Sequence, residues 1–184
     1  MTMAGRLSTE IPLGLDRVLG WVDRLSTFAG WTAGLALLGL LVLMLSEVFA
    51  RNLLGVSIPI AWDYSAYLMG TVFFLAAAGA LRHGIHVRVT LLNEALPQSI
   101  ASKVKLLAAI LAFAIACYVC FALGDQTYQS FKRGAKSFSV VATPLWIPQL
   151  VFLTGSVIFA FQLMVHAIRI GFGAEAETRT ADQI

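Results

Sequence analysis

The side chains of this sequence that could take part in chemistry gather at the ends of apolar segments. Glu47 and Arg51 are four residues apart with the acid first, the order that favours an ion pair along a helix. Trp62 and Asp63 follow a proline-marked bend a few residues later. Charges at an apolar boundary need partners. The group therefore either forms a local ion pair that ends a membrane span or makes a polar contact with a partner subunit.

Three histidines and two cysteines are the candidate ligands for a haem or a metal. His166 together with His83 or His86 could hold one haem near the membrane surface, which leaves a haem-binding anchor of a redox enzyme as an alternative. Interfacial hydrogen bonding is the simpler role for these histidines. Cys117 and Cys120 lie in the middle of an apolar stretch, where cysteine acts as a small hydrophobic residue. We expect no catalytic residue, no metal site and no cofactor.

The composition places the chain in a membrane. Hydrophobic residues make up 59% of the sequence and charged residues only 12%. Soluble domains carry about 25% charged residues, so a soluble protein of this length would lack the charges to cover its surface. The net charge of +3 comes from basic residues at the ends of apolar runs, where they set orientation and meet lipid headgroups. We infer an integral membrane protein with no nucleic-acid partner.

Four apolar runs predict an all-α membrane domain over residues 1–173. The uncharged runs 25–46, 64–81 and 106–124 hold 22, 18 and 19 residues, close to the length that crosses a bilayer. The first run ends without a small-x-small cleavage site, which argues against a signal peptide. The predicted spans are about 25–50, 60–82, 102–124 and 144–170, with interfacial amphipathic helices at about 12–24 and 85–97 and a disordered cytoplasmic tail at 174–184.

The distribution of basic residues predicts the orientation. With four spans, the side that holds both termini and the 82–105 connection carries nine Lys and Arg residues, and the other side carries four. The positive-inside rule therefore places both termini in the cytoplasm. Lys103 and Lys105 can extend from the first turn of the third span to the lipid headgroups.

The predicted spans carry no Asp, Glu, Lys or Arg near their middle. Carriers place such residues, or helices broken by Gly and Pro, at the substrate site. The sequence therefore favours a scaffold or anchoring subunit over an independent carrier, although a small homo-oligomeric carrier remains an alternative. Small residues such as Gly30 and Gly34 in the first span and Ala66 and Gly70 in the second predict close helix packing.

Residues 47–92 resemble the small membrane subunit, of the DctQ type, of tripartite ATP-independent periplasmic (TRAP) transporters. The resemblance rests on Arg51-Asn52 at the end of the first span, Ser57-Ile58-Pro59 at the bend, and the run FFLAAAGALRHGIHVRVTLL. Within that run, seven residues fall where the family typically shows Arg-x-Gly-x-His-Ile-x-Val-Asp-x-Leu: Arg82, Gly84, His86, Val87, Arg88, Val89 and Leu92.

The sequence departs from this family pattern at two places. Trp62 occupies the first position of an acidic pair that is usual at the head of the second span, so that only Asp63 remains. Thr90 stands where Asp is common. Both departures bear on roles that would need those acids. The four-span layout agrees with the family over residues 15–170.

The resemblance implies a non-catalytic scaffold in the inner membrane of a bacterium. Its partners would be a large multi-span subunit, which holds the substrate and sodium sites, and a soluble periplasmic binding protein that it helps to dock. The transporter would take up an organic acid or a related small solute. We expect spans one and two to hold the large subunit and the 85–97 segment to brace the complex. The residues expected to contact partners or lipid are Glu47, Arg51, Trp62, Asp63, Arg82, His86, Arg88, Lys103 and Lys105.

Overall fold

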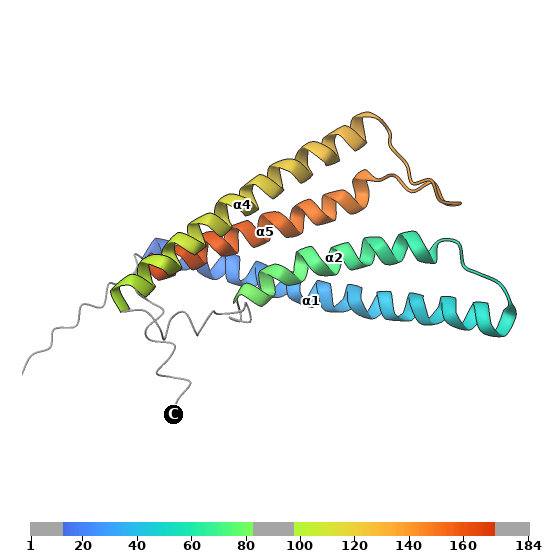
Figure 1. Cartoon of the computed structure of the whole chain (residues 1–184), viewed down its shortest axis with the longest axis horizontal. Helices are drawn as coiled ribbons and strands as arrows, with labels where there is room; N and C mark the ends of the chain where they lie inside the picture. Colours follow the sequence, from blue (N-terminus) through green and yellow to red (C-terminus); the bar gives the residue numbers. More distant parts are fainter. Residues whose placement is uncertain (1–12, 83–97, 172–184) are drawn as a thin grey trace, which may run out of the picture.

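The computed structural model describes residues 13–82 and 98–171, and this part of the chain is helical (Figure 1). Four helices are long and apolar enough to cross a membrane, which confirms the predicted all-α membrane fold. The helices are α1 (Leu13–Phe49), α2 (Ala61–Arg82), α4 (Gln98–Lys132) and α5 (Trp146–Gly171), and a five-residue π-helix, η1 (Ala50–Leu54), continues α1.

Helix α1 joins the predicted lead-in helix and the first span into one element of 37 residues. No proline interrupts it, and its glycines are isolated ones, which a helix tolerates. The helix ends where η1 widens the last turn and Gly55 takes a left-handed conformation with φ of 67°. Glycine reaches this conformation without the penalty that a Cβ would bring. The predicted 85–97 helix and the 174–184 tail lie outside the described residues.

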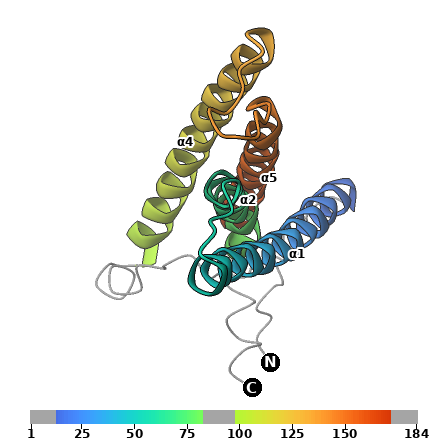
Figure 2. The same ribbon diagram turned by 90° about the vertical axis from the view of Figure 1, so that its right-hand side faces the viewer.

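The four helices form two antiparallel pairs that meet along α2 and α5. Helix α1 packs on α2, α4 packs on α5, and α1 also reaches α5. Figure 2 shows the resulting order of α4, α5, α2 and α1 across the molecule. In Figure 1 the two pairs diverge toward the end that carries η1 and the connection from α4 to α5. The arrangement is closer to a row of helices than to a closed bundle, so most side chains of α1 and α4 face outward.

Small residues allow the helices to approach closely, both within the α1–α2 pair and where the two pairs meet. The backbones of Gly30 in α1 and Gly79 in α2 face each other, since a Cβ added at Gly79 would lie 3.4 Å from the Cα of Gly30. Two further glycines are paired with aromatic residues between α2 and α5, namely Gly155 with Phe74 and Gly70 with Phe152. Dispersion contacts of this kind drive helix association in lipid, where no hydrophobic effect acts between helices.

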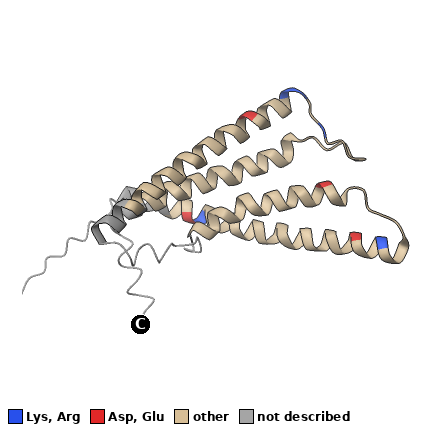
Figure 3. Cartoon of the chain, in the orientation of Figure 1, with Lys and Arg blue, Asp and Glu red and all other residues tan. Residues whose placement is uncertain are grey.

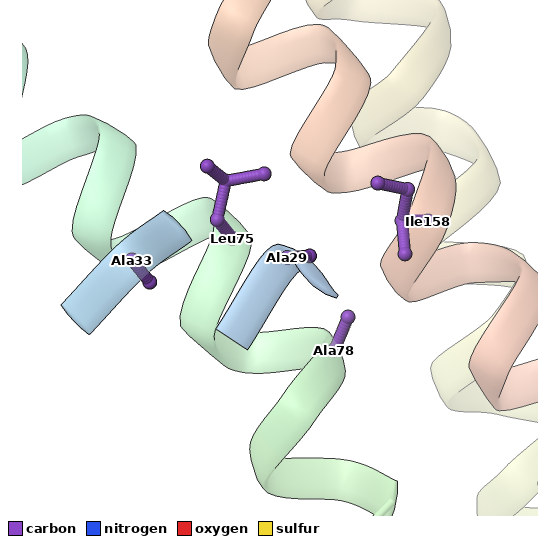
Figure 4. Packing of buried hydrophobic residues seen from close by; sticks show 5 residues of the cluster. All are labelled: Ala29, Ala33, Leu75, Ala78 and Ile158. Carbon is purple, nitrogen blue, oxygen red and sulfur yellow. The ribbon is translucent and has the colours of Figure 1, made fainter. Parts of the chain in front are cut away.

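The buried core is small and lies around α2 and α5. One cluster brings together Ala29, Ala33, Leu75, Ala78 and Ile158 from three helices (Figure 4). A second cluster, made of Ala116, Ala160 and Leu163, joins α4 to α5. In the spanning part of α5, 39% of residues are buried, against 11% in α1 and in α4. Helix α5 is therefore the central element of the fold.

The connection between α4 and α5 is an ordered hairpin. Gly134 turns the chain with φ of 61°, and Lys136 and Pro144 form an antiparallel bridge. Backbone hydrogen bonds link the N–H of Ser137 to the carbonyl of Thr143 (2.9 Å) and the N–H of Leu145 to the carbonyl of Ala135 (3.0 Å). The hairpin formed by residues 134–145 therefore holds a defined shape at the end of the helix pair.

Candidate subunit interface and polar contacts

Glu47 makes the most hydrogen bonds among the predicted contact residues whose side chains the structure describes. It is 5% exposed, and its carboxylate accepts hydrogen bonds from the Arg51 guanidinium, the Ser57 hydroxyl and the backbone N–H of Ile58, each at 2.6 Å. Arg51 is half exposed and extends outward from this contact. The acid therefore ties the end of α1 to the turn that leads into α2, and its neighbours within the chain already satisfy both carboxylate oxygens.

Asp63 connects α2 to the 134–145 hairpin. Its carboxylate accepts a hydrogen bond from the Ser137 hydroxyl at 2.6 Å. One residue further along α2, the Tyr64 and Thr143 hydroxyls lie 3.4 Å apart. These contacts bridge the two helix pairs at the end where the pairs diverge. This connection could not be predicted, because a carboxylate and a serine 74 positions apart form no local pattern.

A polar cluster inside the helix row joins α1 to α5. Gln162 is 2% exposed; its side-chain oxygen accepts a hydrogen bond from the Ser26 hydroxyl (2.9 Å), and its side-chain nitrogen donates to the Asp23 carboxylate (3.0 Å). The sequence analysis did not predict this site, because it relied on the absence of Asp, Glu, Lys and Arg from the middle of the spans and did not consider Gln162. The available signal was an amide within the apolar run of α5, since a polar side chain there needs a partner.

The last two turns of α4 carry a polar ladder. The side-chain amide of Gln129 donates to the Asp125 carboxylate at 2.7 Å, and the Arg133 guanidinium donates to the Gln129 side-chain oxygen. The ladder follows the surface of the helix and leaves these groups exposed. Lys132 is also exposed at this level. Figure 3 shows that most charged positions lie toward the helix ends, whereas Asp23 and Arg24 lie ten and eleven residues inside α1.

The remaining predicted contact residues are only partly placed. Trp62 is 66% exposed at the head of α2, where an indole suits the boundary of a membrane. Arg82, Lys103 and Lys105 lie within the described helices, but the structure does not describe their side chains. His86 and Arg88 lie outside the described residues, so the roles expected for both stay predictions.

The candidate haem and metal ligands are also only partly described. Cys117 is exposed on α4, and the Cys120 thiol lies 3.4 Å from the Ser156 hydroxyl between α4 and α5. His166 lies half-buried in α5, whereas His83 lies outside the described residues. Within residues 13–82 and 98–171, no group of three or more His, Cys, Asp and Glu side chains is suited to hold a metal ion.

Large apolar side chains cover the outward surfaces of the outer helices. Trp31 and Leu35 of α1 are 78% and 70% exposed, and Tyr118 and Phe121 of α4 are 72% and 75% exposed. A surface of this kind meets lipid tails or the helices of another membrane protein. The geometry thus combines internal polar ties with wide apolar faces and suits a subunit that packs against partners within the membrane.

Comparison with known proteins agrees with this description. The chain has no match among curated proteins or among solved structures. The family model for the DctQ component of tripartite ATP-independent periplasmic transporters matches residues 40–171, which is more than half of the chain. The matched region begins in α1, before the Glu47 network, and runs to the end of α5. The chain therefore belongs to the DctQ family, the small membrane subunits of TRAP transporters.

Proposed function

We propose that this chain is a non-catalytic scaffold subunit of a sodium-coupled TRAP transporter in the inner membrane of a bacterium. It packs against the large multi-span subunit and helps to dock the soluble periplasmic binding protein. The transporter takes up an organic acid or a related small solute, and the chain itself binds no substrate. Membership of the DctQ family is the observation that carries this proposal. Both termini face the cytoplasm, in agreement with the excess of basic residues on that side.

The polar groups within the helix row support a scaffold role. Gln162 is engaged by Ser26 and Asp23, and the Ser156 hydroxyl donates to the carbonyl of Leu153 at 2.8 Å. A substrate site needs polar groups that are free to bind a solute, and transporters build such sites from interrupted helices near the middle of the membrane. The Gln162 contacts instead join α1 to α5, and the Ser156 bond stays within α5.

The arrangement of the helices supports the same role. A row of spans exposes far more apolar surface per helix than a closed bundle does, and α1 and α4 bury only 11% of their spanning residues. A large partner could pack against a row of this kind and gain a wider immobile wall, against which its moving parts slide. The internal ties at Glu47, Asp63 and Gln162 would keep that wall rigid.

Reconstitution tests the proposal directly. The chain is purified from its native membrane in mild detergent, and a large multi-span protein is expected to copurify with it in a colourless one-to-one complex. Proteoliposomes that contain this complex and the purified binding protein should take up the solute only with an inward sodium gradient. Proteoliposomes that lack this chain, or that contain it alone, should not.

Three results would contradict the proposal, each in a different way. Uptake by the chain alone would identify a homo-oligomeric carrier. A red eluate with a Soret band would identify a haem-binding anchor. Full uptake by the large subunit and the binding protein without this chain would show that no scaffold is needed. Replacing sodium with potassium on both sides tests the coupling ion separately from the scaffold role.

A further inference from the structure

Tyr118 lies on the outward face of α4 with its phenol unpaired. Its side chain is 72% exposed, and its hydroxyl has no hydrogen-bond partner among the residues that the structure describes. The buried face of α4, which includes Ala109, Ala116 and Thr127, lies elsewhere on the helix. Among the described helices, α4 packs chiefly on α5. The described residues of the chain therefore leave the Tyr118 side of α4 uncovered.

The depth of Tyr118 in the membrane makes an exposed hydroxyl without a hydrogen-bond partner unusual. It stands twelve residues after Leu106 and six before Gly124, the two ends of the uncharged run. At about 1.5 Å per residue, it lies roughly 9 Å from the nearer boundary and roughly 18 Å from the farther one. Helical side chains lean toward the N-terminus of their helix, so this phenol leans away from the nearer boundary. Neither water nor lipid headgroups can then supply a hydrogen-bond acceptor.

Trp31 of α1 provides an internal comparison. It is 78% exposed and stands six residues after Leu25, the start of the uncharged run of α1, so it also lies roughly 9 Å from its nearer boundary. Its indole leans toward that boundary, because the boundary is on the N-terminal side. Trp31 can therefore reach the headgroup region, as interfacial tryptophans do. Tyr118 cannot, and a polar group held in hydrocarbon without a partner is costly.

We propose that the outward face of α4 around Tyr118 binds a transmembrane helix of the large subunit, which supplies the acceptor that the phenol lacks. This inference rests on the proposed scaffold function and deepens it. It also moves the main contact from the first two spans, which the sequence favoured, to the opposite edge of the helix row (Figure 2).

The pattern of exposed residues on α4 fits a helix as the occupant. Steps of four and three residues link a continuous exposed stripe, which is the spacing of a helix-packing seam. The stripe consists of Leu107, Leu111, Ala114, Tyr118, Phe121, Asp125, Tyr128 and Lys132. Ala114, one turn from Tyr118, permits a close approach at this depth.

The charge of the stripe narrows the chemistry of the partner. Asp125 is already paired with Gln129, whereas Lys132 makes no hydrogen bond or ion pair within the described residues. The polar side chains of the stripe that make no hydrogen bond among the described residues are Tyr118, Tyr128 and Lys132, and each of them can donate one. The complementary helix therefore carries a hydrogen-bond acceptor near the middle of the membrane and an acidic group about 21 Å further along, at the level of Lys132.

Photo-crosslinking in the assembled transporter tests which face binds. A benzophenone amino acid replaces Tyr118 in one variant and Trp31 in the matched control, in cells that also express the large subunit and the binding protein. Irradiation should join position 118 to the large subunit, while position 31 should give lipid adducts. Adducts of position 118 with lipid alone, or with a second copy of this chain, would overturn the inference. So would adducts with the large subunit from position 31 alone.

The substitution Tyr118→Phe tests the hydrogen bond itself. Recovery of the large subunit in a detergent pulldown should fall about threefold to tenfold, the range expected for one interhelical hydrogen bond. Tyr128→Phe is the matched control, because Tyr128 lies on the same stripe at a level that water reaches, and it should change little. Thermal stability of the isolated chain should not change in either variant. Equal recovery for both variants would refute the role of the Tyr118 hydroxyl.

The two proposals fail in distinguishable ways. If the unmodified chain recovers no large subunit, the proposed function is wrong, and so is the assignment of the α4 face to a helix of that subunit. If the complex forms but crosslinks arise only from other helices, the scaffold role stands and only the assignment of the α4 face is wrong.

Discussion

Gly155 of α5 lies directly against Phe74 of α2. A Cβ added to Gly155 would lie 2.9 Å from both the carbonyl carbon and the Cβ of Phe74. Real Cβ atoms do not approach that closely, and the atoms in the way include backbone, which cannot rotate aside. At Gly70 a Cβ would meet the far end of the Phe152 ring, which can move. The Gly155–Phe74 contact therefore fixes the distance between the two helix pairs.

Gly155→Ala should separate α2 from α5 and destabilise the chain. We expect the free energy of unfolding in detergent to fall by about 1–3 kcal/mol, as for other overpacked sites. Gly34→Ala is the control, because a Cβ there would meet nothing within 4 Å. Thermal unfolding of both variants measures the difference. Equal stability of Gly155→Ala and wild type would show that the helices separate freely at this point.

The hydrogen bond between Ser26 and Gln162 should appear as a coupling energy. Gln162→Leu removes both contacts of the amide, and Ser26→Ala removes one partner. A double-mutant cycle of these changes should give an interaction energy of about 0.6–1.7 kcal/mol, the range of interhelical hydrogen bonds in membranes. Thermal or denaturant unfolding in detergent measures each corner of the cycle. Strict additivity would mean that the bond adds nothing to stability.

Loss of the Glu47 carboxylate should loosen the turn between α1 and α2. Glu47→Ala leaves the Arg51 guanidinium, the Ser57 hydroxyl and the Ile58 N–H without their acceptor, whereas Glu47→Gln keeps one oxygen. Trypsin added to the outer face of spheroplasts should therefore cleave after Arg51 fastest in Glu47→Ala and at an intermediate rate in Glu47→Gln. Ser65→Ala, which removes a hydroxyl outside this network, serves as the control. Equal cleavage rates for all variants would contradict the conclusion that the Glu47 carboxylate holds the turn between α1 and α2.

The orientation can be checked with single cysteines placed at opposite ends of the helix row. In a background without Cys117 and Cys120, Val140→Cys puts a thiol on the exposed tip of the 134–145 hairpin, and Ser99→Cys puts one at the start of α4. A membrane-impermeant thiol reagent should label position 140 in intact spheroplasts and position 99 only after lysis. The reverse pattern would place both termini outside the cytoplasm.

The four spans could be predicted because they depend on composition alone. Uncharged runs of 18 residues or more have few alternatives to a membrane helix, and the structure has a helix over each predicted span. The Glu47–Arg51 pair was also accessible, because residues four apart on a helix are neighbours. The additional bonds of Glu47 to Ser57 and Ile58 were not, because they depend on how the chain turns after η1.

Contacts between helices were beyond the reach of the sequence. Small residues mark where a helix can be approached closely, but they do not say which helix approaches. Gly155 and Phe74, or Asp63 and Ser137, therefore became pairs only when the order of the helices was known. The position of Tyr118 illustrates the same limit. Its depth follows from the sequence, whereas its outward direction follows only from the packing of α4 on α5.

The exposed edge of the helix row affects how much of this protein accumulates in a cell. Helix α4 packs chiefly on α5 and buries only 11% of its spanning residues. In a copy without a partner subunit, α4 is therefore held mainly by one neighbouring helix. Binding to the folded state raises stability, and a copy that stays unbound gains none of this. We therefore expect surplus copies to open more often and to be removed by membrane proteases. The abundance of this chain would then follow the synthesis of its partner, and degradation rather than matched translation would keep the subunits in proportion.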